Sequence, residues 1–312
     1  MIRVSVIIPV YNAAEFLEKA VGSALQLEEV KEIILIEDGS ADDSLTVCRK
    51  LAAEDYRIRF FQHPNGENRG AAATRNLGIE KASEEFITFL DADDFYLSNR
   101  FDAEKEIFKN ADIEGVFGAI GTEYLTEKGK QEFQSKFNNI SLSTVNYPAE
   151  GEEIFRGLLR LTPKFFATSI PLNTLTIKRQ SLDRHGIRFN PALRLHQDTE
   201  FTIRLAYHCH LKTGIIDKAI AMRGIHDNNR ITKIIRYTPE YNQRQLLYWT
   251  SLYNWSVSRK LPNEYKKRIY LIYKSFDLAL KHGAGKYACI LLEAIKNPEI
   301  LKTRYRFTYY RR

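Results

Sequence analysis

The sequence predicts an α/β fold built around a mostly parallel sheet. Over the first ninety residues, short apolar segments rich in β-branched residues alternate with longer segments of helical apolar spacing. Such alternation is typical of βαβ units, in which a helical crossover returns each strand parallel to the last. The chain has 312 residues, of which 44% are hydrophobic and 27% charged, so a large buried core is possible.

The first strand is expected at Val4–Val10, which is almost entirely apolar. The helix expected next, at Ala13–Leu27, carries its apolar residues three and four positions apart. The same reasoning gives strands at Glu32–Ile36, Arg57–Gln62 and Phe86–Leu90, and helices at Asp42–Glu54 and Gly70–Lys81.

Beyond residue 95 the pattern is less regular. Gly115–Tyr124 is expected to be one strand, and the polar stretch Gly129–Asn146 a loop or short hairpin. Further on, the patterns predict a strand at Leu175–Lys178, a helix at Asp198–His208, and three helices at Tyr241–Arg259, Glu264–Lys281 and Gly285–Lys296.

Charge divides the chain unevenly. Residues 230–312 hold 18 Lys and Arg against 5 Asp and Glu, a balance of +13, whereas residues 1–229 hold 28 against 34, a balance of −6. The polar stretch His226–Arg230 is the expected boundary, which separates an acidic body from a basic, aromatic, mainly helical C-terminal region. The sequence shows no membrane-spanning stretch, no export signal and no paired cysteine motif, so we expect a cytoplasmic protein with reduced cysteines.

In a parallel sheet, ligands bind beyond the carboxyl ends of the strands. Asp91 and Asp93 directly follow a predicted strand, where extended backbone would point both carboxylates to one side. A divalent cation such as Mg²⁺ or Mn²⁺ suits such a pair. The alternative is that Asp91–Asp94 cap a following helix.

Three other polar segments have two interpretations each. Glu37–Ser40 ends the second strand and could bind a ribose or a base, or form only a turn. Asp198 could be a general base or a helix N-terminal acid, and His226 a metal ligand or a structural residue. No GxGxxG motif or P-loop is present, which argues against a dinucleotide oxidoreductase or P-loop NTPase.

Six segments in this order resemble a family 2 inverting glycosyltransferase with the GT-A fold, a member of the nucleotide-diphospho-sugar transferase superfamily. They are Val4–Asn12, Ile33–Ser40, Glu67–Ile79, Phe86–Asp94 with its DxD, Ile187–Leu205 and Arg223–His226. The resemblance implies a GT-A catalytic domain over 1–229, with a nucleotide-sugar half at 1–95 and an acceptor half at 96–229.

The resemblance also implies roles for single residues. The residues expected to bind the nucleotide sugar are Pro9, Tyr11, Asn12, Asp38, Asn68, Arg75, Asp91 and Ala92. Asp93 would ligate Mn²⁺ or Mg²⁺, with His226 completing the metal or diphosphate contacts. Asp198 would be the catalytic base. Gln197 stands where the family usually has an acid, so Glu200 stays an alternative base.

The expected reaction is metal-dependent, inverting transfer of a hexosyl-type sugar from a nucleotide-diphosphate donor, a UDP-sugar by resemblance, to an acceptor hydroxyl. The resemblance suggests a glycan or lipid-linked glycan acceptor in bacterial surface polysaccharide or glycolipid synthesis. The alternatives are a non-catalytic sugar-nucleotide-binding protein and a nucleotidyltransferase. No nucleic acid is expected as a partner, because the body is acidic and carries no recognised nucleic-acid motif.

The basic C-terminal region mixes aromatic and basic residues, including Lys266–Arg268 and Arg304–Arg312. That composition suits an anionic membrane surface, which would place the protein peripherally at the inner face of the membrane. The competing interpretations are a purely structural helical bundle with aromatic residues in its core, and a protein or nucleic-acid partner.

Overall fold

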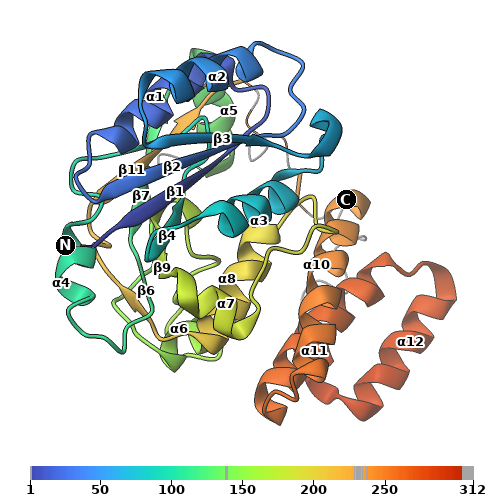
Figure 1. Ribbon diagram of the computed structural model, residues 1–312. Coiled ribbons are helices and arrows are strands. Elements are labelled where there is room, and N and C mark those ends of the chain that lie inside the picture. Colours follow the sequence, from blue (N-terminus) through green and yellow to red (C-terminus); the bar gives the residue numbers. More distant parts are fainter. Residues whose placement is uncertain are drawn as a thin grey trace. The chain divides into compact units, whose positions relative to one another are not determined.

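The computed structural model describes residues 2–137, 140–227, 229, 233, 235–236 and 238–303 (Figure 1). The chain divides into two compact units, Met1–Thr232 and Lys233–Arg312.

A central seven-stranded sheet organises the first unit. Its strands lie in the order β10 (Leu211–Thr213), β6 (Gly115–Phe117), β9 (Thr176–Lys178), β4 (Phe86–Phe89), β1 (Val4–Val10), β2 (Val30–Glu37) and β3 (Ile58–Gln62). Only β9 runs antiparallel to its neighbours; every other pair in this sheet is parallel. The predicted α/β class with a mostly parallel sheet is therefore confirmed.

Helices cover both faces of this sheet. α1 (Ala14–Leu25) and α2 (Ser44–Glu54) lie on one face, and α3 (Ala71–Lys81) lies on the other, against β1 and β2 (Figure 1). Because β1 is central and covered on both sides, its residues are buried except for the half-buried Pro9. The sequence patterns located these elements to within a few residues.

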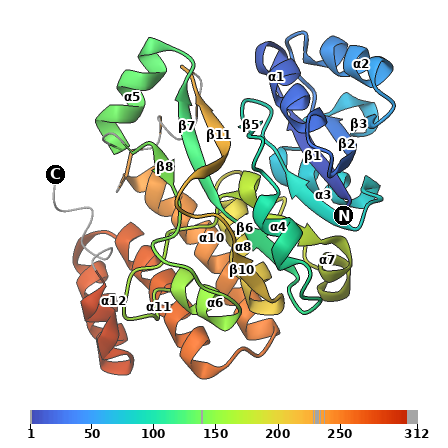
Figure 2. The same cartoon turned by 90° about the vertical axis from the view of Figure 1, so that its left-hand side faces the viewer.

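A smaller sheet follows the order β5 (Phe95–Tyr96), β11 (Ala219–Ile225), β7 (Ala119–Tyr124) and β8 (Leu142–Ser143). Figure 2 shows β7 and β11 side by side, with α5 (Glu127–Phe137) near their ends. The other helical segments of this unit are α4 (Asp102–Ile107), α6 (Glu152–Leu158), α7 (Arg179–His185), α8 (Gln197–His208), η1 (Pro64–Gly66) and η2 (Leu172–Thr174).

Two expectations for the middle of the chain were wrong. Gly115–Tyr124 is two strands in different sheets, because the chain changes sheet at Gly118, where a Cβ would lie 2.5 Å from the Ile215 carbonyl oxygen. Gly129–Asn146 contains most of helix α5 and strand β8 instead of a loop. Helix α5 is mostly polar and buries only Gly129 and Phe133, so its sequence carries little apolar periodicity.

The second unit is helical. It contains α10 (Pro239–Ser258), α11 (Asn263–Leu280), α12 (Gly283–Lys296) and the 3-10 helix η3 (Pro298–Lys302). Tyr248, Trp249 and Tyr265 are buried, as a helical bundle with an aromatic core requires. The basic end Arg304–Arg312 lies outside the described residues. Among the described helices, none combines the length and apolar character needed to cross a bilayer.

Candidate active site

A cleft of about 750 Å³ opens where the parallel strands β1, β2 and β4 end. The parallel register brings the segments after Val10, Glu37 and Phe89 to one edge of the sheet. Every site residue expected from the sequence lines this cleft: Pro9, Tyr11, Asn12, Asp38, Asn68, Arg75, Asp91, Ala92, Asp93, Asp198 and His226.

Arg75 of α3 lies at the centre of the cleft and binds two carboxylates. Its Nη2 donates to Oδ1 of Asp91 at 2.6 Å, and its Nη1 donates to Oδ1 of Asp198 at 2.9 Å. Burial alone would lower the pKa of Arg75, but the charges of Asp198 and Asp91 outweigh burial and raise it. The side chain is only 4% exposed, and the two carboxylates keep its guanidinium cationic inside the cleft.

Asp198 occupies the first turn of α8, where the helix dipole favours a negative charge. Burial in the cleft raises its pKa above the ordinary aspartate value, and Arg75 opposes that rise. Water still reaches the carboxylate, since 43% of the side chain is exposed. Glu200 faces elsewhere: it is 2% exposed and forms a buried ion pair with Arg204 at 2.6 Å.

Asp91 and Asp93 have different partners, contrary to the expectation of two carboxylates on one side of an extended chain. The backbone turns here, with the amide of Asp94 donating to the carbonyl of Asp91 at 3.0 Å. Asp91 therefore faces Arg75, while Oδ2 of Asp93 lies 3.1 Å from Nε2 of His226. The capping alternative is also wrong, because strand β5 follows Asp94 and no helix begins until Asp102.

The pair Asp93 and His226 fits a divalent cation. Neighbouring ligands of an octahedral Mg²⁺ lie about 3 Å apart, because each metal–ligand bond is about 2.1 Å long. The 3.1 Å separation of the carboxylate oxygen and the imidazole nitrogen meets that requirement. The ring of Phe16 packs on His226 with centroids 4.6 Å apart, which orients the imidazole. Two protein ligands leave positions for water and phosphate oxygens.

Asp38 directly follows β2 and holds the start of α3. Its carboxylate accepts from the backbone amides of Arg69 at 2.7 Å and Gly70 at 2.9 Å. Asn68 donates to the Asp38 carbonyl oxygen at 2.8 Å. Asp38 is therefore part of the turn that shapes the cleft, and its carboxylate retains acceptor capacity toward a ligand, since each oxygen has two lone pairs.

Asn12 connects the ends of β1 and β2. Its backbone amide donates to Oγ of Ser40 at 3.0 Å, and its Oδ1 accepts from the amide of Ala41 at 2.8 Å. Its φ of +49° is left-handed, a conformation that asparagine tolerates better than most residues. The neighbouring Tyr11 keeps 45% of its surface exposed beside the cleft.

Sequence reasoning missed three polar residues around the cleft. Asn173 binds the DxD turn: its Oδ1 accepts from the amide of Asp91 at 3.2 Å and its Nδ2 donates to the carboxylate of Asp94. Asn229 donates to Oδ2 of Asp93 at 3.3 Å. Arg194 lines the cleft over Gly70. Each of the three residues is more than 100 positions away in sequence, or about 80 in the case of Asn173, from the residue that it contacts, so the contacts become visible only in the folded chain.

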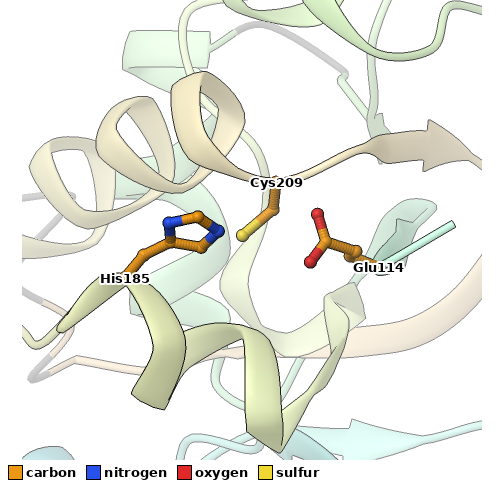
Figure 3. Close-up of side chains that lie close together, drawn as sticks. All are labelled: Glu114, His185 and Cys209. Atoms are coloured by element: carbon orange, nitrogen blue, oxygen red, sulfur yellow. The ribbon is translucent and has the colours of Figure 1, made fainter. Parts of the chain in front are cut away.

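A second polar cluster lies outside the cleft. Glu114, His185 and Cys209 bring one ligand atom each to within 4.8 Å of one another, and Figure 3 shows their side chains pointing together. Glu114 already accepts from Ser181 Oγ at 2.7 Å and from the His210 amide at 2.9 Å. Burial raises the pKa of the Cys209 thiol to about 12, so it is neutral at physiological pH. These contacts describe a structural junction between the ends of α7 and α8.

Comparison with known proteins agrees with this fold and cleft. In the solved structure of Staphylococcus aureus TarS residues 1–349 in complex with UDP-GlcNAc, 79% of that chain matches 96% of this one, with a TM-score of 0.63 and 17% identity. At that identity the likeness concerns the fold alone.

Several curated relatives that match this chain are named as glycosyltransferases of bacteria. The succinoglycan biosynthesis protein ExoU of Rhizobium meliloti is 35% identical over 64% of this chain and 56% of its own length. The GalNAc(5)-diNAcBac-PP-undecaprenol beta-1,3-glucosyltransferase of Campylobacter jejuni is 27% identical over 97% of this chain and 96% of its own. A glycosyltransferase of Haemophilus influenzae is 41% identical over 32% of this chain. The chain spans between 24% and 40% of the length of that protein and of two Rickettsia glycosyltransferases.

The family model for glycosyl transferase family 2 matches residues 5–167, just over half of the chain. The matched segment contains the ends of β1, β2 and β4 that form the cleft, together with Arg75 and the DxD turn. With this match, the glycosyltransferase relatives and the shared GT-A architecture, the chain belongs to the family 2 glycosyltransferases.

Proposed function

We propose that this glycosyltransferase transfers a sugar from a UDP-sugar to an acceptor hydroxyl, with a divalent metal and with inversion at the anomeric carbon. The observation that carries the proposal is the arrangement around Arg75. One buried cation joins the DxD aspartate Asp91 to Asp198, and Asp93 and His226, which lie 3.1 Å apart, line the same cleft.

Asp38 and Arg75 support the donor assignment. The Asp38 carboxylate at the end of β2 can accept from the N3–H of uracil, beside Tyr11 and Asn68 in the cleft. Arg75 and Arg194 supply positive charge where a diphosphate would lie. Asp93 and His226 would hold Mn²⁺ or Mg²⁺, which when bound offsets the negative charge that develops on the departing diphosphate.

Asp198 is the residue that we assign as the base. Its Oδ1 is bound by Arg75, and among the described residues no hydrogen bond occupies Oδ2, which is left to receive a proton. As the acceptor oxygen bonds to the anomeric carbon, its proton passes to Asp198 and the bond to the diphosphate oxygen breaks with its electron pair. The nucleoside diphosphate leaves unprotonated, so one carboxylate suffices. Glu200 is a poor candidate, because its ion pair with Arg204 is buried.

We propose a lipid-linked glycan as the acceptor and the inner face of a bacterial membrane as the place of reaction. The support is the Campylobacter relative, whose name specifies an undecaprenol-linked glycan and whose length matches almost all of this chain. The +13 balance of residues 230–312 agrees with an anionic surface.

A donor panel tests the function without knowledge of the acceptor. UDP-, dTDP- and GDP-sugars are incubated with the full chain in Mn²⁺, in Mg²⁺ or in a chelator, and released nucleoside diphosphate is measured. We expect slow release from a UDP-sugar that requires the metal. Release from GDP-sugars alone would refute the uracil assignment, and full activity in chelator would refute the metal. Pyrophosphate release from a nucleoside triphosphate would instead indicate nucleotidyl transfer.

A further inference from the structure

Helix α12 exposes an apolar face. Tyr287 is 54% exposed, Leu291 64%, Leu292 61% and Ile295 72%. With 3.6 residues per turn, positions 287, 291 and 295 align along one face, and 292 lies beside them. Ala284 and Ala288 belong to the same exposed arc, and the exposed Lys296 ends the helix one turn after Leu292. Four large apolar side chains together on a 14-residue helix mark an interaction surface.

The opposite face of α12 is buried and partly polar. Lys286 and Glu293 point inward: Nζ of Lys286 donates to the Ala279 carbonyl oxygen at 3.3 Å, and Glu293 accepts from the Tyr270 hydroxyl at 2.9 Å. Ile290 is the one large aliphatic residue of α12 in the small core it shares with α11 and η3. The helix thus buries charged groups while leucines face outward, so packing among the described residues 238–303 does not account for its sequence.

The charge of the sequence at and after the end of α12 favours a negatively charged partner. Lys296 and Lys302, the basic residues there that the structure describes, are both exposed. From Lys296 to the end, the sequence holds six basic residues against the single acid Glu299, together with four aromatic residues. A second copy of the chain would bring the +13 balance of residues 230–312 against another +13. An anionic lipid surface attracts that charge and also accepts the apolar side chains.

We infer that α12 lies in the interface of an anionic membrane, with Tyr287, Leu291, Leu292 and Ile295 at the boundary of headgroups and acyl chains. Lys296 at the end of α12 and Lys302 at the end of η3 contact the lipid phosphates. The inference rests on the proposed function in one respect: a lipid-linked acceptor would be bound at the membrane surface. Membrane binding itself is measured separately from donor hydrolysis.

Vesicle flotation of the full chain tests this. We expect binding to phosphatidylcholine vesicles that contain phosphatidylglycerol, weaker binding at high salt, and little binding to phosphatidylcholine alone. The double variant Leu291→Ser/Leu292→Ser should bind about a hundredfold more weakly, because each buried leucine contributes about one factor of ten or more. The matched control Leu247→Ser/Val257→Ser removes apolar residues of α10 that are 57% and 50% exposed, and it should bind like the wild type.

Charge is tested by Lys296→Gln/Lys302→Gln, which changes the exposed last residue of α12 and the exposed last residue of η3. This variant should bind more weakly at low salt and differ less from the wild type at high salt. Equal binding by the wild type and the leucine variant would overturn the inference, as would no binding by the wild type. A concentration-dependent dimer that the leucine variant disperses, without vesicle binding, would assign the face to a second copy. If the leucine variant melts several degrees below the wild type, the apolar face of α12 packs against another part of the same chain instead of a membrane.

Donor hydrolysis distinguishes this failure from failure of the proposed function. The leucine variant should release nucleoside diphosphate from a soluble donor at the wild-type rate, because α12 contributes no residue to the cleft. Lost vesicle binding with full hydrolysis supports the inference, whereas lost hydrolysis in that variant contradicts it.

Discussion

Nη1 of Arg75 and Oδ1 of Asp198 lie 2.9 Å apart, although 123 positions separate them in the sequence. The contact joins α3, which packs under β1, to the first turn of α8. It places the carboxylate that we assign as the base beside the cation that faces the DxD turn. The first three predictions below follow from this cleft.

The variant Asp198→Asn should lose turnover while it keeps the donor. Asparagine preserves the shape of the side chain but cannot accept a proton, so kcat should fall about 10²- to 10⁴-fold. Calorimetry with UDP should give an affinity close to the wild type. The control is Asp217→Asn, an exposed aspartate away from the cleft. If Asp198→Asn turns over at close to the normal rate, another group must accept the proton from the acceptor hydroxyl.

The variant Asp93→Asn should weaken metal-dependent binding of the nucleotide sugar by at least roughly tenfold, because a ligand carboxylate is replaced by a neutral amide. Calorimetry of UDP-sugar binding in Mn²⁺ and in a chelator measures the effect. The wild type should lose affinity in chelator, whereas the variant should be equally weak in both buffers. An unchanged affinity in Mn²⁺ would exclude Asp93 as a ligand.

The acid limb of the pH–rate profile should lie above the ordinary aspartate range. Burial raises the pKa of Asp198, and a base must be deprotonated to act, so kcat falls as the pH drops through that raised value. The ordinary aspartate pKa is about 3.9. Measured kcat between mildly acidic and neutral pH should therefore decline before pH 4 is approached. A profile that stays flat down to that pH would contradict the assignment, as would an Asp198→Asn variant with the same limb.

The variant Asn173→Ala should destabilise the DxD turn. It removes a donor to the buried carboxylate of Asp94 and an acceptor for the amide of Asp91. An unsatisfied buried polar group costs about 1–3 kcal/mol, which urea unfolding can resolve. Asn110→Ala, at an exposed turn, is the control. Equal midpoints for the two variants would show that Asn173 does not hold the turn.

Gly39→Ala should be more harmful than Gly186→Ala. Both glycines have a left-handed φ, of +70° and +59°, which costs an alanine about 1–2 kcal/mol. A Cβ at Gly39 would also lie 2.7 Å from the Gly66 carbonyl oxygen, whereas Gly186 has open space around it. The difference between the two unfolding free energies measures the clash, and only Gly39→Ala should also weaken UDP binding. Equal losses of unfolding free energy in the two variants would show that the turn at Gly39 accommodates the added Cβ without a clash.

The sequence was most informative where strands and helices repeat. β1, β2 and β4 are buried on both faces, and their sequences are therefore mostly apolar. Polar residues that follow them line the cleft. It was least informative where a local pattern is weak. Helix α5 has few apolar positions, and the break at Gly118 depends on the approach of Ile215 from a distant segment.

The partners of the DxD aspartates show a second limit. Spacing alone placed Asp91 and Asp93 on one side, but the turn at Asp94 separates them. Asn173 and Asn229 contact this turn from positions about 80 and 136 residues away, and no motif marks either one. Such contacts depend on the order of strands in the two sheets, which residue periodicity does not encode.

The guanidinium shared by Asp91 and Asp198 has a consequence for mutagenesis. If one carboxylate is removed, Arg75 stays bound to the other. Only when both are removed does the buried guanidinium lose every compensating negative charge. The effects of the two single substitutions should not sum to that of the double substitution. A thermodynamic cycle over these positions would measure their coupling energy, and the three side chains should be interpreted as one cooperative unit.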